Sequence, residues 1–112
     1  MPGLGVALEI ESYGERDGID ARKARELLKV AEEAAANAVR HGRPERLHVR
    51  LGWHEGVTLR IDDDGAGFDV AAPSKGTGLN SMRRRADQLQ GVLEVRSRLD
   101  EGTSLELKVP QP

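Results

Sequence analysis

The sequence contains no cysteine, which excludes disulfide bonds and metal sites built on thiolates. It has no apolar run approaching the roughly 20 residues that a membrane-spanning helix needs. Its start, MPGLGVALEIES, lacks the basic and apolar blocks of a signal peptide. A net charge of −2 gives no strong field to attract nucleic acid or an acidic membrane. We therefore expect a soluble cytoplasmic domain.

The length of 112 residues is usual for one domain, and a hydrophobic content of 38% can still build one core. Alternating apolar residues indicate strands, and helical spacing indicates helices. The expected strands are 5–12, 46–53, 57–64, 92–99 and 104–109, and the expected helices are about 20–40 and 79–90. This order predicts an α+β two-layer sandwich, with a mostly antiparallel sheet and the helices on one face.

The long helix carries Glu33, Asn37 and His41 at steps of four. Its apolar stripe is expected to contain Ala24, Leu27, Leu28, Ala31, Ala35, Ala38 and Val39. At about 100° per residue, the three polar residues fall roughly opposite that stripe. A solvated outer face would explain them, although Asn is a poor helix former. A carboxylate and an amide one turn apart could instead hold Mg²⁺ and a water near phosphate oxygens.

Asp63 continues the apolar row of strand 57–64, so its carboxylate requires a hydrogen-bond donor. It could cap the following turn, because Asp-Gly pairs favour turns. It could also accept a hydrogen bond from the exocyclic amine of adenine, with Gly65 and Gly67 letting the backbone approach the ring. Thr103 has the parity of the apolar residues in strand 104–109. It could share a ligand or water with Asp63, or bond to backbone as an ordinary strand residue.

The segment SKGTGLNSM (74–82) places two glycines just before the second helix. Backbone N–H groups at a helix N-terminus can bind an anion. The segment lacks the G-x-x-x-x-G-K-[ST] spacing of a Walker A loop. It is also not a Rossmann fingerprint, because no strand leads directly into it.

Four segments, taken together, resemble the GHKL superfamily. Residues 33–41, with Glu33, Asn37, Arg40 and His41, resemble its N box, and 63–68 (DDGAGF) resemble its G1 box. Residues 76–79 (GTGL) resemble its G2 box, and Gly102-Thr103 resembles the G-T before its last strand. They occur in family order from about residue 30 to the end. The N-A-V-R-H form, the short lid and G-L-x-x-M-x-x-R at 78–85 are most similar to histidine kinases that partner LuxR/NarL-type response regulators.

This resemblance implies the Bergerat fold, here a mixed five-stranded sheet with about two to three helices on one face. It implies ATP and Mg²⁺ as cofactors. It assigns Asn37 to Mg²⁺ and Glu33, rather than its neighbour Glu32, to acid–base chemistry. It assigns phosphate contacts to Arg40, His41 and Lys75, and adenine contacts to Asp63 and Thr103. It assigns the hinges of the ATP lid to Gly65, Gly67, Gly76 and Gly78, and nucleotide binding also to Thr77 and Leu79 of the G2 box.

A complete histidine kinase also needs a dimerising helical domain with a phosphoacceptor histidine. None of the three histidines, His41, His48 and His54, lies in an acidic helical motif of the H-[DE] kind. We therefore expect residues 1–112 to be a single catalytic domain, cut from a longer protein or free-standing. It should be a monomer that binds ATP–Mg²⁺ without autophosphorylating.

The expected partners are the dimerisation domain of a parent kinase and, indirectly, a response regulator. No contact with nucleic acid or membrane is expected from this domain, although the parent protein could be membrane-anchored. Two alternatives remain: a stand-alone serine kinase of the anti-sigma-factor type, and a non-catalytic nucleotide-binding module with the same fold.

Overall fold

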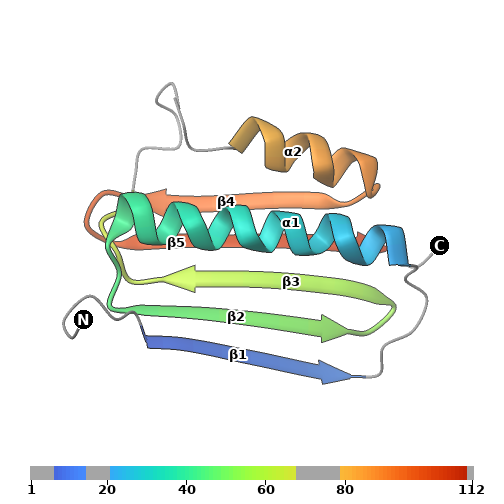
Figure 1. Ribbon diagram of the computed structural model, residues 1–112, viewed down its shortest axis with the longest axis horizontal. Coiled ribbons are helices and arrows are strands. Elements are labelled where there is room, and N and C mark those ends of the chain that lie inside the picture. The colour runs from blue at the N-terminus through green and yellow to red at the C-terminus, as the bar shows by residue number, and fades with distance from the viewer. Residues whose placement is uncertain (1–6, 15–20, 68–78, 111–112) are drawn as a thin grey trace.

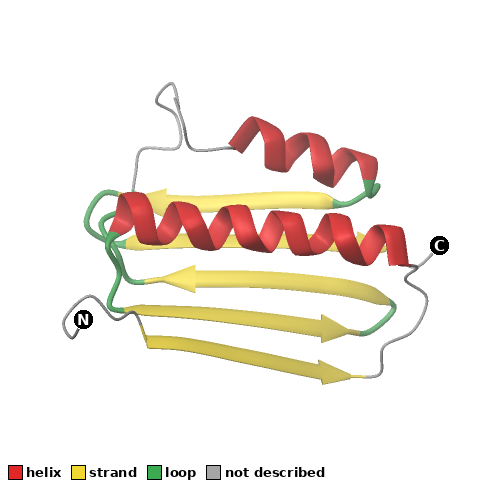
Figure 2. Cartoon of the chain, viewed as in Figure 1, coloured by secondary structure: helices red, strands yellow, loops and turns green. Residues whose placement is uncertain are grey.

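The computed structural model describes residues 7–14, 21–67 and 79–110, and Figure 1 shows their arrangement. The elements are β1 (Ala7–Gly14), α1 (Ala21–Asn37), a π-helical turn η1 (Ala38–Gly42), β2 (Arg46–Trp53), β3 (Gly56–Asp63), α2 (Leu79–Gln88), β4 (Val92–Arg98) and β5 (Gly102–Pro110). Both α-helices lie over one face of the sheet, and no described helix covers the other face (Figure 2). The predicted α+β two-layer sandwich is confirmed.

The sheet has five strands in the order β1-β2-β3-β5-β4. The β1–β2 pair is parallel, and the other three pairs are antiparallel. The mixed, mostly antiparallel sheet predicted from the sequence is therefore correct. Because β5 lies between β3 and β4, the end of β3 meets the start of β5, and Asp63 is the register partner of Thr103.

The core lies between the helices and the sheet face beneath them. Val57, Leu59 and Ile61 of β3 are buried there, as their alternation predicts. The second helix also packs one side on the core, with Leu79, Met82, Ala86 and Leu89 all buried at helical spacing. Full burial of one such large aliphatic side chain stabilises the fold by about 1.5–3 kcal/mol.

The predicted stripe of α1 is wrong at its edges. Leu28 and Val39 are 58% and 48% exposed, whereas Val30 and Ala34, which the prediction omitted, are buried. The helix is thus rotated by roughly 60° from the expected orientation. Alanine lies on several sides of this helix, and its small side chain allows close packing wherever it occurs. The rotation brings the side of α1 that carries Asn37 toward the sheet.

The end of α1 also differs from the predicted helix, which runs to about residue 40. The α-helix stops at Asn37 and continues as η1 through Gly42. The left-handed residue after it is Arg43, at φ 45° and ψ 54°, rather than a glycine. Left-handed backbone is disfavoured for arginine, so other contacts must hold this segment.

Within the described ranges, no helix combines the length and hydrophobicity needed to cross a membrane.

Candidate functional site

Three polar residues of β3, β5 and β4 form one cross-strand row, which we call the inner row: Asp63, Thr103 and Ser97. It continues the buried apolar rows of the strands on the helix-covered face, as parity predicted for Asp63 and Thr103. The Asp63 carboxylate accepts a hydrogen bond from the Gly65 N–H at 2.8 Å and another from the Thr103 backbone N–H. Burial nevertheless raises the pKa of Asp63 above its usual value.

The side-chain hydroxyl of Thr103 lies 2.7 Å from that of Ser97. Ser97 is also within hydrogen-bond distance of the Gly102 carbonyl, at 3.2 Å. This contact holds the Thr103 hydroxyl against Ser97 of β4, while the Thr103 backbone N–H bonds Asp63 of β3. Ser97 was not predicted from the sequence, although its parity with the partly buried Leu93 and Val95 in β4 was a usable signal.

Two glycines allow the turn after β3 to pack against the β4–β5 turn. A Cβ on Gly67, whose φ is 66°, would collide with the carbonyl oxygen of Arg98. A Cβ on Gly102, whose φ is 84°, would collide with the carbonyl oxygen of Asp63. The Asp100 N–H donates to the Ala66 carbonyl at 2.6 Å, which closes the contact. The close approach of these turns is what brings Thr103 beside Asp63.

A second row, one residue away, faces the side of the sheet opposite the helices; we call it the outer row. It consists of Asp62, Ser104 and Arg96. Asp62 lies 2.9 Å from Arg60 Nε and 3.6 Å from Arg50 Nη2. Burial acts to raise the pKa of Asp62, but hydrogen bonds from Arg60 and Ser104 hold that pKa below its usual value.

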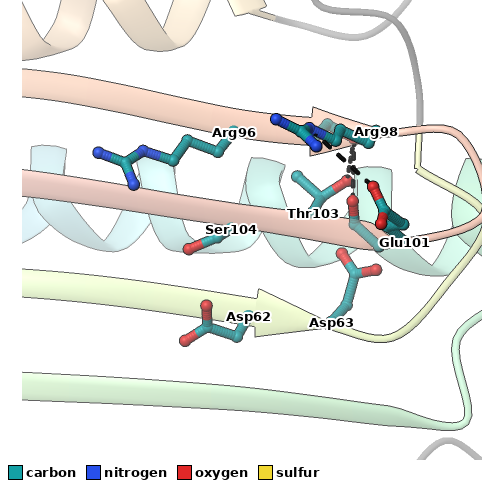
Figure 3. A pocket seen from close by; sticks show the side chains of 9 residues that line it. Asp62, Asp63, Arg96, Arg98, Glu101, Thr103 and Ser104 are labelled. Atoms are coloured by element: carbon teal, nitrogen blue, oxygen red, sulfur yellow. Dashed lines mark hydrogen bonds and ion pairs between the residues drawn. The ribbon is translucent and has the colours of Figure 1, made fainter.

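Residues of both rows line a shallow hollow of about 280 Å³ at the ends of β3, β4 and β5. Figure 3 views it with α1 behind the strands, so that Asp62, Ser104 and Arg96 lie along the face turned away from the helix. Asp63 and Thr103 appear at the end of the hollow that lies beside the β4–β5 turn. The hollow thus marks the edge where the two faces meet.

The polar residues of α1 lie on the flank of its buried stripe rather than opposite it. Glu33 and Asn37 are half-buried, whereas Glu32 is exposed. Arg40 Nη2 donates to Asn37 Oδ1 at 2.9 Å, so these two N-box side chains lie together. The side chain of His41 is outside what the structure describes, as are Lys75, Gly76, Thr77 and Gly78. Leu79 begins α2, and its side chain is buried in the core.

The C-terminal end of α1 and the C-terminal end of β3 lie at the same end of the molecule (Figure 1). The chain leaves α1 through η1 and enters β2, whose Leu47 is the register partner of Asp63. Asp64 strengthens this link, because its Oδ1 accepts the backbone N–H groups of Glu45 and Arg46, both at 2.9 Å. No role was predicted for Asp64 from the sequence. Its donors lie 18 and 19 residues away, and no periodicity indicates such a contact.

Residues 22–112 match the family described as "Histidine kinase-, DNA gyrase B-, and HSP90-like ATPase". The chain belongs to this family. The resemblance to the GHKL superfamily is thereby confirmed. The half-buried Glu33 and Asn37 lie in the segment that resembles the N box, and the Asp63–Thr103 pair joins the segments that resemble the G1 box and the closing G-T.

Relatives in this family include sensor histidine kinases. The chain is 37% identical over 86 residues to Sensor histidine kinase LiaS of Bacillus subtilis, covering 75% of this chain and 24% of that protein. It is 32% identical over 109 residues to Sensor protein VraS of Staphylococcus saprophyticus, covering 96% of this chain and 30% of the relative. The chain therefore spans less than a third of the length of these curated relatives.

Solved structures share the fold. The ATP-binding domain of PrrB from Mycobacterium tuberculosis aligns with a TM-score of 0.70 at 22% identity, covering 94% of this chain and 81% of that one. The histidine kinase domain of the blue-light activated kinase of Erythrobacter litoralis aligns with a TM-score of 0.75 at 16% identity, covering 94% of this chain and 52% of that one. These likenesses show the fold, and the family membership rests on the match over residues 22–112.

Proposed function

We propose that this domain binds ATP–Mg²⁺ for a two-component sensor histidine kinase and donates the γ-phosphoryl group to a histidine on a separate dimerisation domain. The observation that carries the proposal is the inner row at the sheet end where α1 also ends. Asp63 and Thr103 lie there on the helix-covered face of the sheet. Asn37 is the last residue of α1 and lies on the flank of its buried side. This arrangement offers one end for adenine and another for phosphates.

At the adenine end, the Asp63 carboxylate would accept a hydrogen bond from the exocyclic amine, and Thr103 would assist. A carboxylate has about four acceptor sites, and backbone N–H groups from Gly65 and Thr103 use only part of that capacity. Rejection of guanine follows, because guanine presents a carbonyl where adenine presents an amine, and two acceptors would then face each other.

At the phosphate end, Asn37 would provide a side-chain oxygen to Mg²⁺, with Arg40, His41 and Lys75 contacting phosphate. Among the described residues, no group of three or more acidic or histidine side chains could hold a metal alone. The described side chains therefore fit an ion that is coordinated mainly by phosphate oxygens and waters, as Mg²⁺ prefers. An amide oxygen such as Asn37 Oδ1 is a suitable hard ligand. Bound Mg²⁺ would neutralise charge on the transferring phosphoryl group.

Glu33 lies one turn before Asn37 on the same flank of α1, and we assign it the acid–base role toward the acceptor imidazole or a water. The assignment favours Glu33 over Glu32 because Glu33 is half-buried on the flank shared with Asn37 and Glu32 is exposed. Gly65, Gly67, Gly76 and Gly78 are proposed as the hinges of the ATP lid, with Thr77 and Leu79 beside them in the G2 box. The turn at Gly67 packs so closely against the Arg98 carbonyl that a Cβ would collide, which supports a place for Gly67 at the base of that lid.

The proposed partners are the helical dimerisation domain of a parent kinase and, through it, a response regulator of the LuxR/NarL type. As an isolated single domain, the chain is proposed to be a monomer that lies in the cytoplasm, where ATP is available. It would not autophosphorylate, because phosphoryl transfer requires the acceptor to be positioned next to the donor.

Calorimetry with ATP, ADP and GTP, with and without Mg²⁺, tests the binding half of this proposal. We expect ATP–Mg²⁺ to bind, GTP to bind at least about tenfold more weakly, and omission of Mg²⁺ to weaken ATP binding. Asn37→Ala should reduce the Mg²⁺-dependent part of the affinity more than the Mg²⁺-independent part. Absence of ATP binding by the wild-type chain would refute the proposal.

Transfer of label from γ-labelled ATP to a histidine-containing dimerisation domain, supplied in trans, tests the catalytic half. Glu33→Gln should lower transfer by about a hundredfold or more while leaving ATP affinity within about twofold. Glu32→Gln is the matched control and should transfer at the wild-type rate. Label on a serine of an anti-sigma antagonist would favour the serine-kinase alternative, and ATP binding without any transfer would favour the non-catalytic module.

A further inference from the structure

Asp64 joins the turn after β3 to the chain at the start of β2. Its carboxylate is exposed, yet one oxygen, Oδ1, accepts both the Glu45 and the Arg46 N–H groups at 2.9 Å. These bonds, that of Arg46 above all, hold the pKa of Asp64 below its usual value. Asp64 is therefore ionised, and able to accept both bonds, throughout the neutral range.

The position of Asp64 explains why its side chain is needed there. The β2–β3 ladder ends at the register pair Leu47–Asp63. One step further out, the N–H groups of Glu45 and Arg46 extend beyond the last β3 residue. Asp64 supplies a side-chain oxygen in place of the missing strand acceptor, and it thereby continues the pairing across the turn.

The segment that Asp64 holds has a backbone conformation that its own residues do not favour. It starts at Asn37, passes through the π-helical η1, and includes Arg43 in the left-handed region. Both features are unfavourable for an L-residue chain without outside contacts, and π turns are frequent at functional sites. Pro44 is buried and fixes one point of this segment. The bonds from Asp64 fix the next two residues to the turn that carries Asp63.

We infer that Asp64 is a positioning residue that sets the spacing between the proposed phosphate end, at Asn37 and Arg40, and the proposed adenine end, at Asp63. The inference rests on the proposed function. Asp64 itself touches neither end of the nucleotide. Removal of the Asp64 carboxylate should weaken the binding of ligands that span both ends. It should leave nearly unchanged the affinity for a ligand that reaches only one end.

Two substitutions separate the hydrogen bonds from the charge. Asp64→Asn keeps an oxygen that can accept both N–H groups, since one oxygen makes both bonds in the structure. Asp64→Ala removes both bonds. Asp87→Ala, at an exposed position on α2, is the matched control for loss of one negative charge.

We expect Asp64→Ala to lower the affinity for ATP–Mg²⁺ by about tenfold and that for adenosine by less than about twofold. Asp64→Asn and Asp87→Ala should stay within about twofold of wild type for both ligands. Calorimetry follows ATP–Mg²⁺, and NMR titration follows the weaker adenosine. Hydrogen exchange of the Glu45 and Arg46 amides should accelerate in Asp64→Ala and not in Asp64→Asn.

Equal weakening of ATP–Mg²⁺ and adenosine in Asp64→Ala would overturn the inference, because it would indicate a general loss of folding. Unchanged ATP–Mg²⁺ affinity despite faster amide exchange would overturn it as well. Both outcomes leave the proposed function intact, since the wild-type chain still binds. A wild-type chain that binds neither ligand would refute the proposed function, and this inference with it.

Discussion

The inner and outer rows at the end of the sheet are one residue apart and have similar composition, yet they differ in how their acids are satisfied. Each has an aspartate in β3 and a hydroxyl in β5. In the outer row, Asp62 is paired with Arg60 and Arg50. In the inner row, Asp63 receives backbone N–H groups, and no arginine or lysine in the described part of the chain forms an ion pair with it.

The difference shows how a binding position can be told from a structural one. The outer acid has its charge neutralised by its neighbours, and its pKa is lowered in spite of burial. The inner acid lies on the helix-covered face with a raised pKa and spare acceptor capacity. A half-buried acid whose charge is left uncompensated costs stability, and such positions are frequent in functional sites.

The largest expected effect compares neighbouring residues of β5 that face opposite sides. Leu107 is fully buried between sheet and helices, so Leu107→Ala should lower the free energy of unfolding by about 3 kcal/mol. Glu106 faces outward and pairs with Arg60 and Lys108 at 3.8 and 3.5 Å. Glu106→Ala should cost about 0.5 kcal/mol. Urea denaturation measures both, and similar losses would contradict a core on one face only.

The next effect concerns the helix that covers the inner face. Val30 is fully buried in α1, so Val30→Ala should cost about 2 kcal/mol of unfolding free energy. Leu28, although larger, is 58% exposed, and Leu28→Ala should change stability by no more than about 0.5 kcal/mol. Thermal unfolding of both variants decides between the observed rotation and the stripe expected from the sequence. A larger loss for Leu28→Ala would restore the sequence-based stripe.

The sequence predicted the sheet side of the site better than the helix side, for a physical reason. Strand parity has a period of two, so Asp63 and Thr103 could be assigned to the core-facing row once the apolar residues beside them were recognised. Helical orientation depends on bulky residues that mark one side. Alanine marks none, and so Leu28 was assigned to the core and Val30 was not.

Contacts between segments far apart in the sequence could not be predicted at all. The bonds from Asp64 to Glu45 and Arg46 depend on where the β2–β3 ladder ends, which differs by one residue from the predicted strand bounds. The same holds for Arg85, which bonds Glu26 across the two helices at 2.7 Å. Both contacts follow from tertiary packing rather than from local pattern.

A third prediction compares the two aspartates directly. Asp63→Asn should weaken ATP–Mg²⁺ binding by at least about tenfold, or about 1.4 kcal/mol. It should leave the stability of the unliganded domain equal or higher, because the substitution removes a carboxylate charge whose burial raises the pKa of Asp63. Asp62→Asn should instead lower the stability by about 0.5 kcal/mol. It should leave the affinity for ATP–Mg²⁺ within about twofold of wild type. Calorimetry and thermal unfolding give both quantities, and unchanged affinity in Asp63→Asn would remove the adenine assignment.

The smallest effect is the order in which the three consecutive aspartates protonate. Burial raises the pKa of Asp63, whereas hydrogen bonds hold the pKa values of Asp62 and Asp64 below the usual range. The ionised forms of Asp62 and Asp64 therefore stabilise the fold above their unfolded-state pKa, and this stabilisation is lost as the pH falls through their folded values. Ionised Asp63 has the opposite sign, since its protonation on acidification relieves a cost. An NMR titration of the side-chain carboxyl carbons in the unliganded domain should show Asp63 protonating first, well before the acid unfolding that follows protonation of the other two. If Asp63 instead titrates together with Asp62, the two faces of the sheet present equivalent environments, and the contrast drawn between them is wrong.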